Sequence, residues 1–149
     1  RVLDSIRRRF DYMFGPERYP GSTSVTLHAV NRPFLIGNVR VVPLPVAHGD
    51  LSIYGYRIGE MAYMTDVQAI PESTMDLLDG VKLLVMGALR WEVPHPSHMT
   101  IEAAVSAAEK VGADRTRFIH MNGSVKHGEG ESMLPSGMRF AYDQEVLWL

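Results

Sequence analysis

Hydrophobic and polar residues alternate through much of the first half of the chain, the period typical of half-buried β-strands. Before these strands, apolar residues at helical spacing predict a helix from Val2 to Phe14. Pro43 and Pro45 cannot donate ladder hydrogen bonds, so their strand is expected to lie at a sheet edge or to break before His48. The alternation predicts strands over residues 24–30, 34–36, 39–46, 51–58 and 61–65, the last two as a hairpin.

The second half reads as strands separated by helices. A continuous apolar run over residues 81–86 predicts a strand covered on both faces. Thr100 as N-cap and Gly112 as terminator delimit the clearest helix. Antiparallel strands first and strand–helix–strand order afterwards predict a mixed sheet in an α/β layer fold. The remaining predictions are a short helix over 71–78, strands over 117–119, 138–142 and 146–149, and a mobile loop over 122–132.

Composition limits the function classes more than it selects one. The 149 residues predict a single domain, and a net charge of −2 gives no electrostatic basis for binding nucleic acid. No apolar stretch is long enough to span a membrane. The absence of cysteine leaves histidine and carboxylates as the only strong metal ligands. We therefore expect a cytoplasmic protein that binds neither membranes nor nucleic acid.

His48 and Asp66 each end a predicted strand, with a Tyr/Ile-rich strand between them. This layout can bring one imidazole and one carboxylate to the same edge of a sheet. A strand-end histidine in a turn is the simpler interpretation of His48, and capping of the next segment is the simpler interpretation of Asp66. An aspartate can also bridge two metal ions, because each of its oxygens can serve one.

His98 and His120 occupy comparable positions later in the chain. His98 ends the segment Pro-His-Pro-Ser-His, whose prolines stiffen the loop, and it directly precedes the helix capped by Thr100. A histidine beside a helix N-terminus can donate a hydrogen bond to an oxyanion or act as an acid. His120 follows a buried strand. The simpler alternatives are a surface loop histidine for His98 and a core imidazole for His120, while His28 and His127 have no supporting context.

Taken together, these segments resemble the metallo-β-lactamase-fold hydrolases, in particular the branch that includes the phosphonate-utilisation cyclic-phosphate phosphodiesterase. The resemblance runs in order along essentially the whole chain. The matching segments are residues 8–12, 45–49, 55–59, 62–66, 88–90, 94–98, 102–103, 120–121, 134–135 and 141–143.

The resemblance implies a fold, a chemistry and roles for four residues. The fold would be the C-terminal half of an αββα sandwich, a mixed sheet with helices on one face. His48 and His120 would each bind one of two divalent cations, Zn²⁺ or Mn²⁺, and Asp66 would bridge them. His98 and Asp66 would be catalytic, with His98 contacting the phosphate and stabilising or protonating the departing oxygen. The reaction would be metal-dependent hydrolysis of a small phosphodiester, linear or cyclic.

The sequence also departs from that family. The His-x-His-x-Asp-His loop of the family is absent, and Arg1 rather than methionine begins the chain, so the N-terminal half of the fold is expected to be missing. Gly87 stands where relatives commonly have aspartate. After His120 the relatives usually continue Met-Ser-His-Asp, whereas this chain continues Met-Asn-Gly-Ser, with Gly123 as the third residue. Three hypotheses remain open: part of an active dinuclear hydrolase, a non-catalytic scaffold, and a half-fold that pairs with a second copy as a homodimer. We expect little activity from these 149 residues alone.

Overall fold

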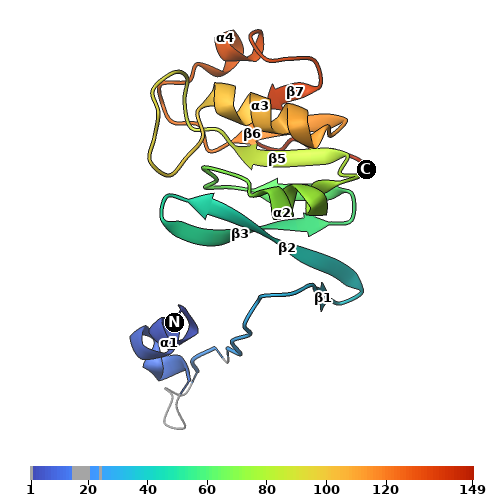
Figure 1. Cartoon of the computed structure of the whole chain (residues 1–149). Coiled ribbons are helices and arrows are strands. Elements are labelled where there is room, and N and C mark those ends of the chain that lie inside the picture. Colours follow the sequence, from blue (N-terminus) through green and yellow to red (C-terminus); the bar gives the residue numbers. More distant parts are fainter. Residues whose placement is uncertain (1, 15–20, 24) are drawn as a thin grey trace. The chain divides into compact units, whose positions relative to one another are not determined.

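The computed structural model describes residues 2–14, 21–23 and 25–149. The chain divides into two compact units, Arg1–Asn31 and Arg32–Leu149. The first holds helix α1 (Val2–Arg9) and the 3₁₀ helix η1 (Asp11–Met13), so the expected helix is present but is interrupted at Phe10 (Figure 1). The strand expected over residues 24–30 is wrong for 25–30, which pair with no other strand, and Ser24 lies outside the described residues. The prediction of one domain over 1–149 stays a prediction.

The second unit is built on one seven-stranded sheet whose spatial order follows the sequence, β1 to β7 (Figure 1). Its first four strands are antiparallel neighbours, and β4 to β7 are parallel neighbours. The mixed α/β sheet predicted from the element order is therefore confirmed. The strands are β1 (Phe34–Ile36), β2 (Val39–His48), β3 (Leu51–Ile58), β4 (Met61–Met64), β5 (Leu83–Gly87), β6 (Arg115–Ile119) and β7 (Met138–Phe140).

The strand directions decide where the candidate residues meet. Because β2 and β4 are both antiparallel to β3, they run in the same direction, and β5 and β6 run parallel to β4. The carboxyl ends of β2, β4, β5 and β6 therefore lie at one edge of the sheet. In α/β sheets this is the edge where ligands usually bind.

Strand β2 tolerates its two prolines without breaking. Ala47, two residues after Pro45, exchanges backbone hydrogen bonds with the segment at Gln68 and Ala69, on the side away from β3. Pro43 and Pro45 are separated from Ala47 by an even number of positions, so their backbone nitrogens face the same side of β2 as that of Ala47. Strand β1 does not pair with β2 there, because the pairing extends only as far as Val41. The expected edge position is thus correct for this part of β2, and the expected break before His48 is not observed.

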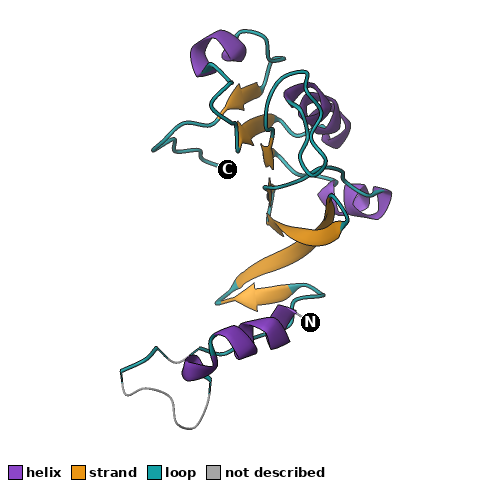
Figure 2. Cartoon of the chain, turned by 90° about the vertical axis from the view of Figure 1, so that its left-hand side faces the viewer, coloured by secondary structure: helices purple, strands orange, loops and turns teal. Residues whose placement is uncertain are grey.

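Two helices of this unit pack on one face of the sheet. Figure 2 shows α2 (Glu72–Met75) and α3 (Ile101–Val111) on the same side of the strands. The side chain of Thr100 caps α3 by accepting a hydrogen bond from the Ala103 N–H, and Gly112 ends it with φ of 69°. The fully or nearly fully buried core comprises Leu44, Val46, Ala62, Met64, Val67, Leu78, Val81, Leu84, Met86, Ala88, Met99, Ile101, Ala104, Ala108, Phe118 and Phe140.

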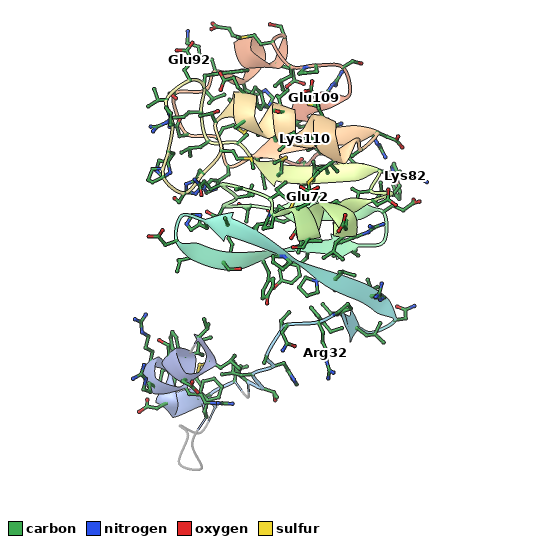
Figure 3. The ribbon with its side chains drawn as sticks, in the orientation of Figure 1. Arg32, Glu72, Lys82, Glu92, Glu109 and Lys110 are labelled. Carbon is green, nitrogen blue, oxygen red and sulfur yellow. The ribbon has the colours of Figure 1, made fainter. Side chains whose placement is uncertain are left out.

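The solvent sides of these helices are charged, as expected for amphipathic helices on a sheet. Glu72 of α2 and Glu109 and Lys110 of α3 are exposed in Figure 3. The 3₁₀ helix η2 (Asp76–Leu78) continues α2, in agreement with the short helix predicted over 71–78. Among the described residues, no helix combines the length and the apolar character that crossing a membrane requires.

Two expectations for the C-terminal third are wrong. The expected mobile loop over 122–132 contains helix α4 (His127–Glu131), whose Gly130 packs against the ring of Phe140. Residues 146–149 form no strand. Side chains of β6 hold this last segment instead: Arg117 pairs with Glu145 at 2.6 Å, and Arg115 donates to the Trp148 carbonyl at 2.6 Å.

Candidate metal centre

The shared carboxyl edge of the sheet brings the four predicted site residues together. His48 is the last residue of β2, Asp66 lies two residues beyond β4, and His120 directly follows β6. His98 comes from the loop between β5 and α3. The sequence separates these residues widely, but the parallel strand directions place them at one locus.

Asp66 lies at the centre of this cluster. Its Oδ1 lies 3.2 Å from Nε2 of His98 and 3.4 Å from Nε2 of His120, and its Oδ2 accepts a hydrogen bond from the Thr65 hydroxyl at 3.2 Å. Desolvation raises the pKa of Asp66, but hydrogen bonds from His98 and Thr65 and the charges of His120 and His98 outweigh it, so the pKa is lowered overall. Asp66 is therefore an ionised acceptor facing two imidazole nitrogens.

His48 is held in one tautomer by two backbone carbonyls. Its Nδ1 lies 2.8 Å from the Asp66 carbonyl oxygen and 2.9 Å from the Ser97 carbonyl oxygen. Because carbonyls only accept hydrogen bonds, Nδ1 must carry the proton and donate it. The Nε2 lone pair is then free, which is the arrangement that metal-ligating histidines usually have.

The imidazole rings are packed against one another around His98. The His48 and His98 ring centroids are 4.8 Å apart at 86°, and the His98 and His120 centroids are 5.0 Å apart at 19°. Asp66 and His120 both adopt left-handed backbone conformations, with φ of 53° and 65°. Non-glycine residues with positive φ are uncommon and concentrate at functional sites. Two of them in one cluster indicate that the fold holds these side chains in place at some cost.

The donor set fits a divalent cation. His48, Asp66 and His98 each offer one nitrogen or oxygen atom, and these three atoms lie within 4.8 Å of one another. Ligands in a tetrahedral site with bonds near 2.1 Å lie about 3.4 Å apart, close to the 3.2 Å and 3.4 Å that separate Asp66 Oδ1 from the two imidazole nitrogens. Nitrogen and oxygen donors without thiolate suit Zn²⁺ and Mn²⁺ alike. The division into ligands His48, Asp66 and His120 and catalytic His98 stays a prediction.

Three residues around the centre were not given roles from the sequence. The Ser97 carbonyl orients His48, the Thr65 hydroxyl binds Asp66, and His95 contacts His98. Desolvation lowers the pKa of His95, and repulsion from His98, Arg90 and His48 lowers it further. The close spacing of Pro-His-Pro-Ser-His was the available signal for His95, whereas a backbone carbonyl leaves no signal in a sequence.

Gly87, the first departure from the family pattern, lies beside this centre. A Cβ at this position would lie 3.3 Å from the backbone nitrogen of Asp66 and 3.7 Å from the carbonyl carbon of Thr65. The residue therefore packs directly against the strand end that carries Asp66. A Cβ at Gly123, the second departure, would meet nothing within 4 Å.

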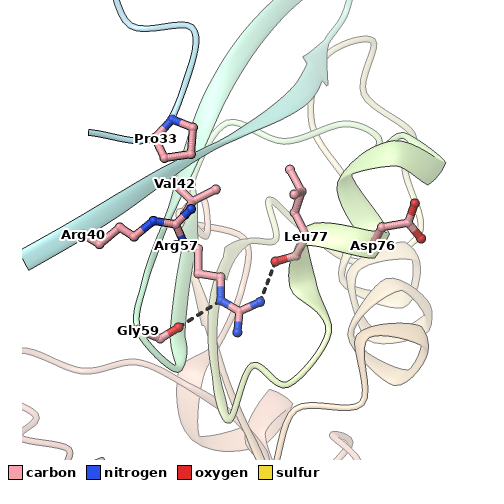
Figure 4. Close-up of a pocket in the computed structure, with 7 residues that line it drawn as sticks. All are labelled: Pro33, Arg40, Val42, Arg57, Gly59, Asp76 and Leu77. Atoms are coloured by element: carbon pink, nitrogen blue, oxygen red, sulfur yellow. Dashed lines mark hydrogen bonds between the residues drawn. The ribbon is translucent and has the colours of Figure 1, made fainter. Parts of the chain in front are cut away.

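A separate cleft of about 450 Å³ lies between β2, β3 and the α2–η2 segment, and none of the four cluster residues lines it (Figure 4). Its most conspicuous group is the Arg57 guanidinium. That group donates to the carbonyl oxygens of Gly59 at 2.9 Å, Leu77 at 2.7 Å and Asp79 at 2.7 Å. Since these backbone acceptors occupy its donors, Arg57 joins two turns of the fold, and the cleft has no comparable convergence of chemical groups.

Comparison with known proteins assigns the family. The family model described as "Beta-lactamase superfamily domain" matches residues 1–121. The chain belongs to this family. The resemblance to metallo-β-lactamase-fold hydrolases inferred from the sequence is thereby confirmed, as is the fold class.

Two solved structures of this superfamily cover nearly all of the chain. A diphosphatase from the PhnP family is 36% identical with a TM-score of 0.84, and the match covers 95% of this chain and 52% of that one. The metallo-β-lactamase-fold protein YhfI from Bacillus subtilis is 16% identical with a TM-score of 0.64, covering 93% of this chain and 59% of that one. At 16% identity the second match concerns the fold alone, whereas the first supports the PhnP-like branch.

A curated relative adds sequence similarity to a longer protein. An octanoyltransferase from Porphyromonas gingivalis is 38% identical over 145 residues, which are 95% of this chain and 30% of that protein. The chain thus spans about a third of this relative and slightly more than half of the two solved structures.

Proposed function

We propose that this superfamily member supplies part of the active site of a metal-dependent hydrolase that cleaves a small phosphodiester, linear or cyclic. The observation that carries the proposal is the approach of His98 and His120 to the same oxygen of Asp66, with His48 in the same cluster. The 36% identity to a diphosphatase of the PhnP family supports phosphorus–oxygen bond chemistry. Because the chain spans 52% of that relative, further ligands would come from residues outside these 149.

In this proposal His48, Asp66 and His120 would be the ligands from this chain for two divalent cations, Zn²⁺ or Mn²⁺. When bound, the cations would polarise the phosphoryl group and lower the pKa of water. Asp66 would supply negative charge to the cations, and its ionised state is favoured by the groups around it. Nδ1–H of His48 is held by two carbonyls, which leaves the Nε2 lone pair available to a cation.

In this proposal His98 acts on the substrate. Its Nε2 lies 3.2 Å from Oδ1 of Asp66, and its side chain is 15% exposed. An imidazole at this position can donate a hydrogen bond to a phosphate oxygen and pass a proton to the departing oxygen. Pairing with a second copy of the chain is retained as a prediction, because it would supply further ligands by another route.

The deciding measurement is the metal content of the purified chain, by mass spectrometry after equilibration with Zn²⁺ or Mn²⁺. We expect wild type to bind metal and His48→Ala and Asp66→Asn to lose it, while the control His127→Ala, in helix α4, retains it. Hydrolysis of bis(4-nitrophenyl) phosphate and of a cyclic nucleotide should be slow and should fall further in both variants. Equal metal content in all four proteins would contradict the proposal and favour a non-catalytic scaffold. No metal in any of them would show that the ligands of this chain are insufficient without further residues.

A further inference from the structure

A second pocket, of about 280 Å³, lies between the loop before α3, the segment after β6 and helix α4 (Figure 1). The loop carries His98, and the segment after β6 begins with His120. Backbone hydrogen bonds join the two, since the Leu89 N–H donates to the Met99 carbonyl and the Asn122 N–H donates to the Leu89 carbonyl, both at 2.9 Å. The pocket thus adjoins the segments that build the metal centre. It is lined by Trp91, Ser124, Lys126, Glu129, Gly130 and Met133.

Trp91 provides the aromatic side of this pocket, and the loop around it is held firmly. The Trp91 carbonyl accepts a hydrogen bond from the Val93 N–H at 2.6 Å, and Arg90 donates to the Val93 carbonyl at 3.0 Å. Glu92 has φ of 54°, and its N–H lies 3.3 Å from both carboxylate oxygens of Glu102. A non-glycine residue keeps such a conformation only where surrounding contacts fix it. The loop therefore holds the indole in a defined place.

Helix α4 comes close to Trp91 because a glycine lies at the contact. A Cβ at Gly130 would lie 3.5 Å from Cζ2 of Trp91 and 2.9 Å from Cε2 of Phe140, too close for any other residue without a shift of the ring. Met133, just beyond α4, is 67% exposed and lines the same pocket. Its thioether is flexible and makes favourable contacts with aromatic rings. The indole and the thioether are thus two apolar groups that a planar ring can contact.

The polar groups of the pocket offer both kinds of hydrogen bond. Lys126 only donates and Glu129 only accepts, and their mutual ion pair, at 3.4 Å with both side chains 75% exposed, is weak. The Ser124 hydroxyl donates to Oδ1 of Asn122 at 2.6 Å, so its oxygen remains an acceptor. Proteins bind an extrahelical nucleobase by stacking it against aromatic or apolar side chains and by hydrogen bonds to its edge. The pocket contains both components.

We propose that this pocket binds the nucleobase of a nucleotide phosphodiester whose phosphate reacts at the metal centre. Small-molecule pockets usually measure about 300–1,000 Å³, so this one suits a single ring system rather than a whole substrate. The neighbouring metal centre would receive the phosphate. This second part rests on the proposed function, whereas binding of the base is a property of the pocket alone.

The first test measures binding of adenosine, which carries the base without a phosphate. Trp91 and Trp148 are the two tryptophans of the chain, so Trp91 is the sole indole in a Trp148→Phe background. With a chelator present, we expect saturable quenching of its fluorescence by millimolar adenosine and none by ribose. Lys126→Ala and Met133→Ala should weaken adenosine binding several-fold. The control Lys110→Ala, on α3, should leave it unchanged.

Three results would overturn the inference. The first is the lack of a saturable response to adenosine, or an equal response to ribose. The second is an adenosine affinity that is the same in Lys126→Ala, Met133→Ala and the control, since adenosine would then contact the indole outside this pocket. The third is phenol bound as tightly as adenosine, because a ring without a hydrogen-bonding edge would then be sufficient.

The second test compares two cyclic phosphodiesters that differ in the base, adenosine 2′,3′-cyclic phosphate and glycerol 1,2-cyclic phosphate, in the presence of Zn²⁺. Trp91→Leu should lower kcat/KM for the adenosine ester about 10-fold, as when one stacked base loses its aromatic partner, and leave that of the glycerol ester unchanged. Equal losses on both esters would overturn the role of Trp91 in binding the base. Adenosine binding without hydrolysis of either ester by wild type would leave the base site intact and count against the proposed function alone.

Discussion

Nε2 of His98 lies 3.2 Å from Oδ1 of Asp66, a contact between residues 32 positions apart in the chain. Only the sheet brings them together, since Asp66 follows β4 and His98 lies in the loop after the neighbouring parallel strand β5. Desolvation raises the pKa of Asp66, and the hydrogen bond from His98 is the largest of the contributions that lower it. The pH dependence of the free energy of unfolding therefore reports on the surroundings of the Asp66 carboxylate.

Asp66 should make the metal-free protein more sensitive to acid. Its pKa is lowered from the ordinary value of 3.8, so the stability it contributes is present above that value and is lost as the pH falls through the lowered pKa. We expect the free energy of unfolding, measured in urea with a chelator, to fall more steeply below about pH 4 in wild type than in Asp66→Asn. Asparagine tolerates positive φ, so the backbone at this site is preserved. Parallel pH profiles for the two proteins would contradict this expectation.

Replacing His120 by glycine should separate stability from metal binding. A non-glycine residue at φ of 65° carries conformational strain of about 1 kcal/mol, which glycine relieves. The variant should therefore unfold at higher urea concentration than wild type when metal is absent, and it should bind less metal. Gln144→Gly, at φ of 66°, is the matched control and should gain stability without losing metal. A destabilised His120→Gly protein would mean that the contacts of the imidazole outweigh the strain.

Gly87→Ala should weaken the centre without touching any candidate ligand. The added Cβ would lie 3.3 Å from the backbone nitrogen of Asp66, which is closer than an ordinary van der Waals contact. The segment after β4 that carries the carboxylate must therefore shift slightly. We expect metal affinity to fall about 10-fold, as when the support of a ligand is lost. The control Gly123→Ala adds the same methyl group to open space and should leave affinity unchanged. Titration with a competing chelator measures both; equal affinities would show that β4 accommodates the methyl group.

Removing one partner of the Arg117–Glu145 ion pair should destabilise the protein, because it leaves the other charge buried and unpaired. The two side chains are only 10% and 11% exposed and their charged atoms lie 2.6 Å apart. Glu145→Leu leaves the guanidinium buried without its carboxylate, which should lower the free energy of unfolding by about 3 kcal/mol. Glu129→Leu, which removes the exposed pair with Lys126 in which both side chains are 75% exposed, should change it little.

A double variant distinguishes an unpaired charge from lost packing. Arg117→Met combined with Glu145→Leu removes both charges and should recover most of the stability lost in Glu145→Leu. Urea unfolding of the single and double variants measures the difference. A double variant no more stable than Glu145→Leu would mean that packing of the C-terminal segment, not the charge, dominates.

Local patterns were sufficient where the decisive interactions are themselves local. Helix α3 was predicted with its cap and terminator because Thr100 bonds within its own first turn and Gly112 adopts positive φ. The β3–β4 hairpin followed from two apolar runs around Gly59 and Glu60 for the same reason. Residues 25–30 alternate as strands do and residues 146–149 are a continuous apolar run, but neither segment forms a strand, because neither pairs with another strand of the sheet.

The sequence by itself was sufficient to select the candidate residues of the metal centre. Histidines and an aspartate at strand ends, together with the absence of cysteine, indicated a nitrogen–oxygen metal centre, and motif order along the chain indicated the superfamily. Only the tertiary structure decided how these groups act on one another. The shared direction of β2, β4, β5 and β6 brings them to one edge, and two backbone carbonyls select the tautomer of His48. Such contacts join segments that are far apart in the chain. Residue types and local spacing do not predict the distances between such segments.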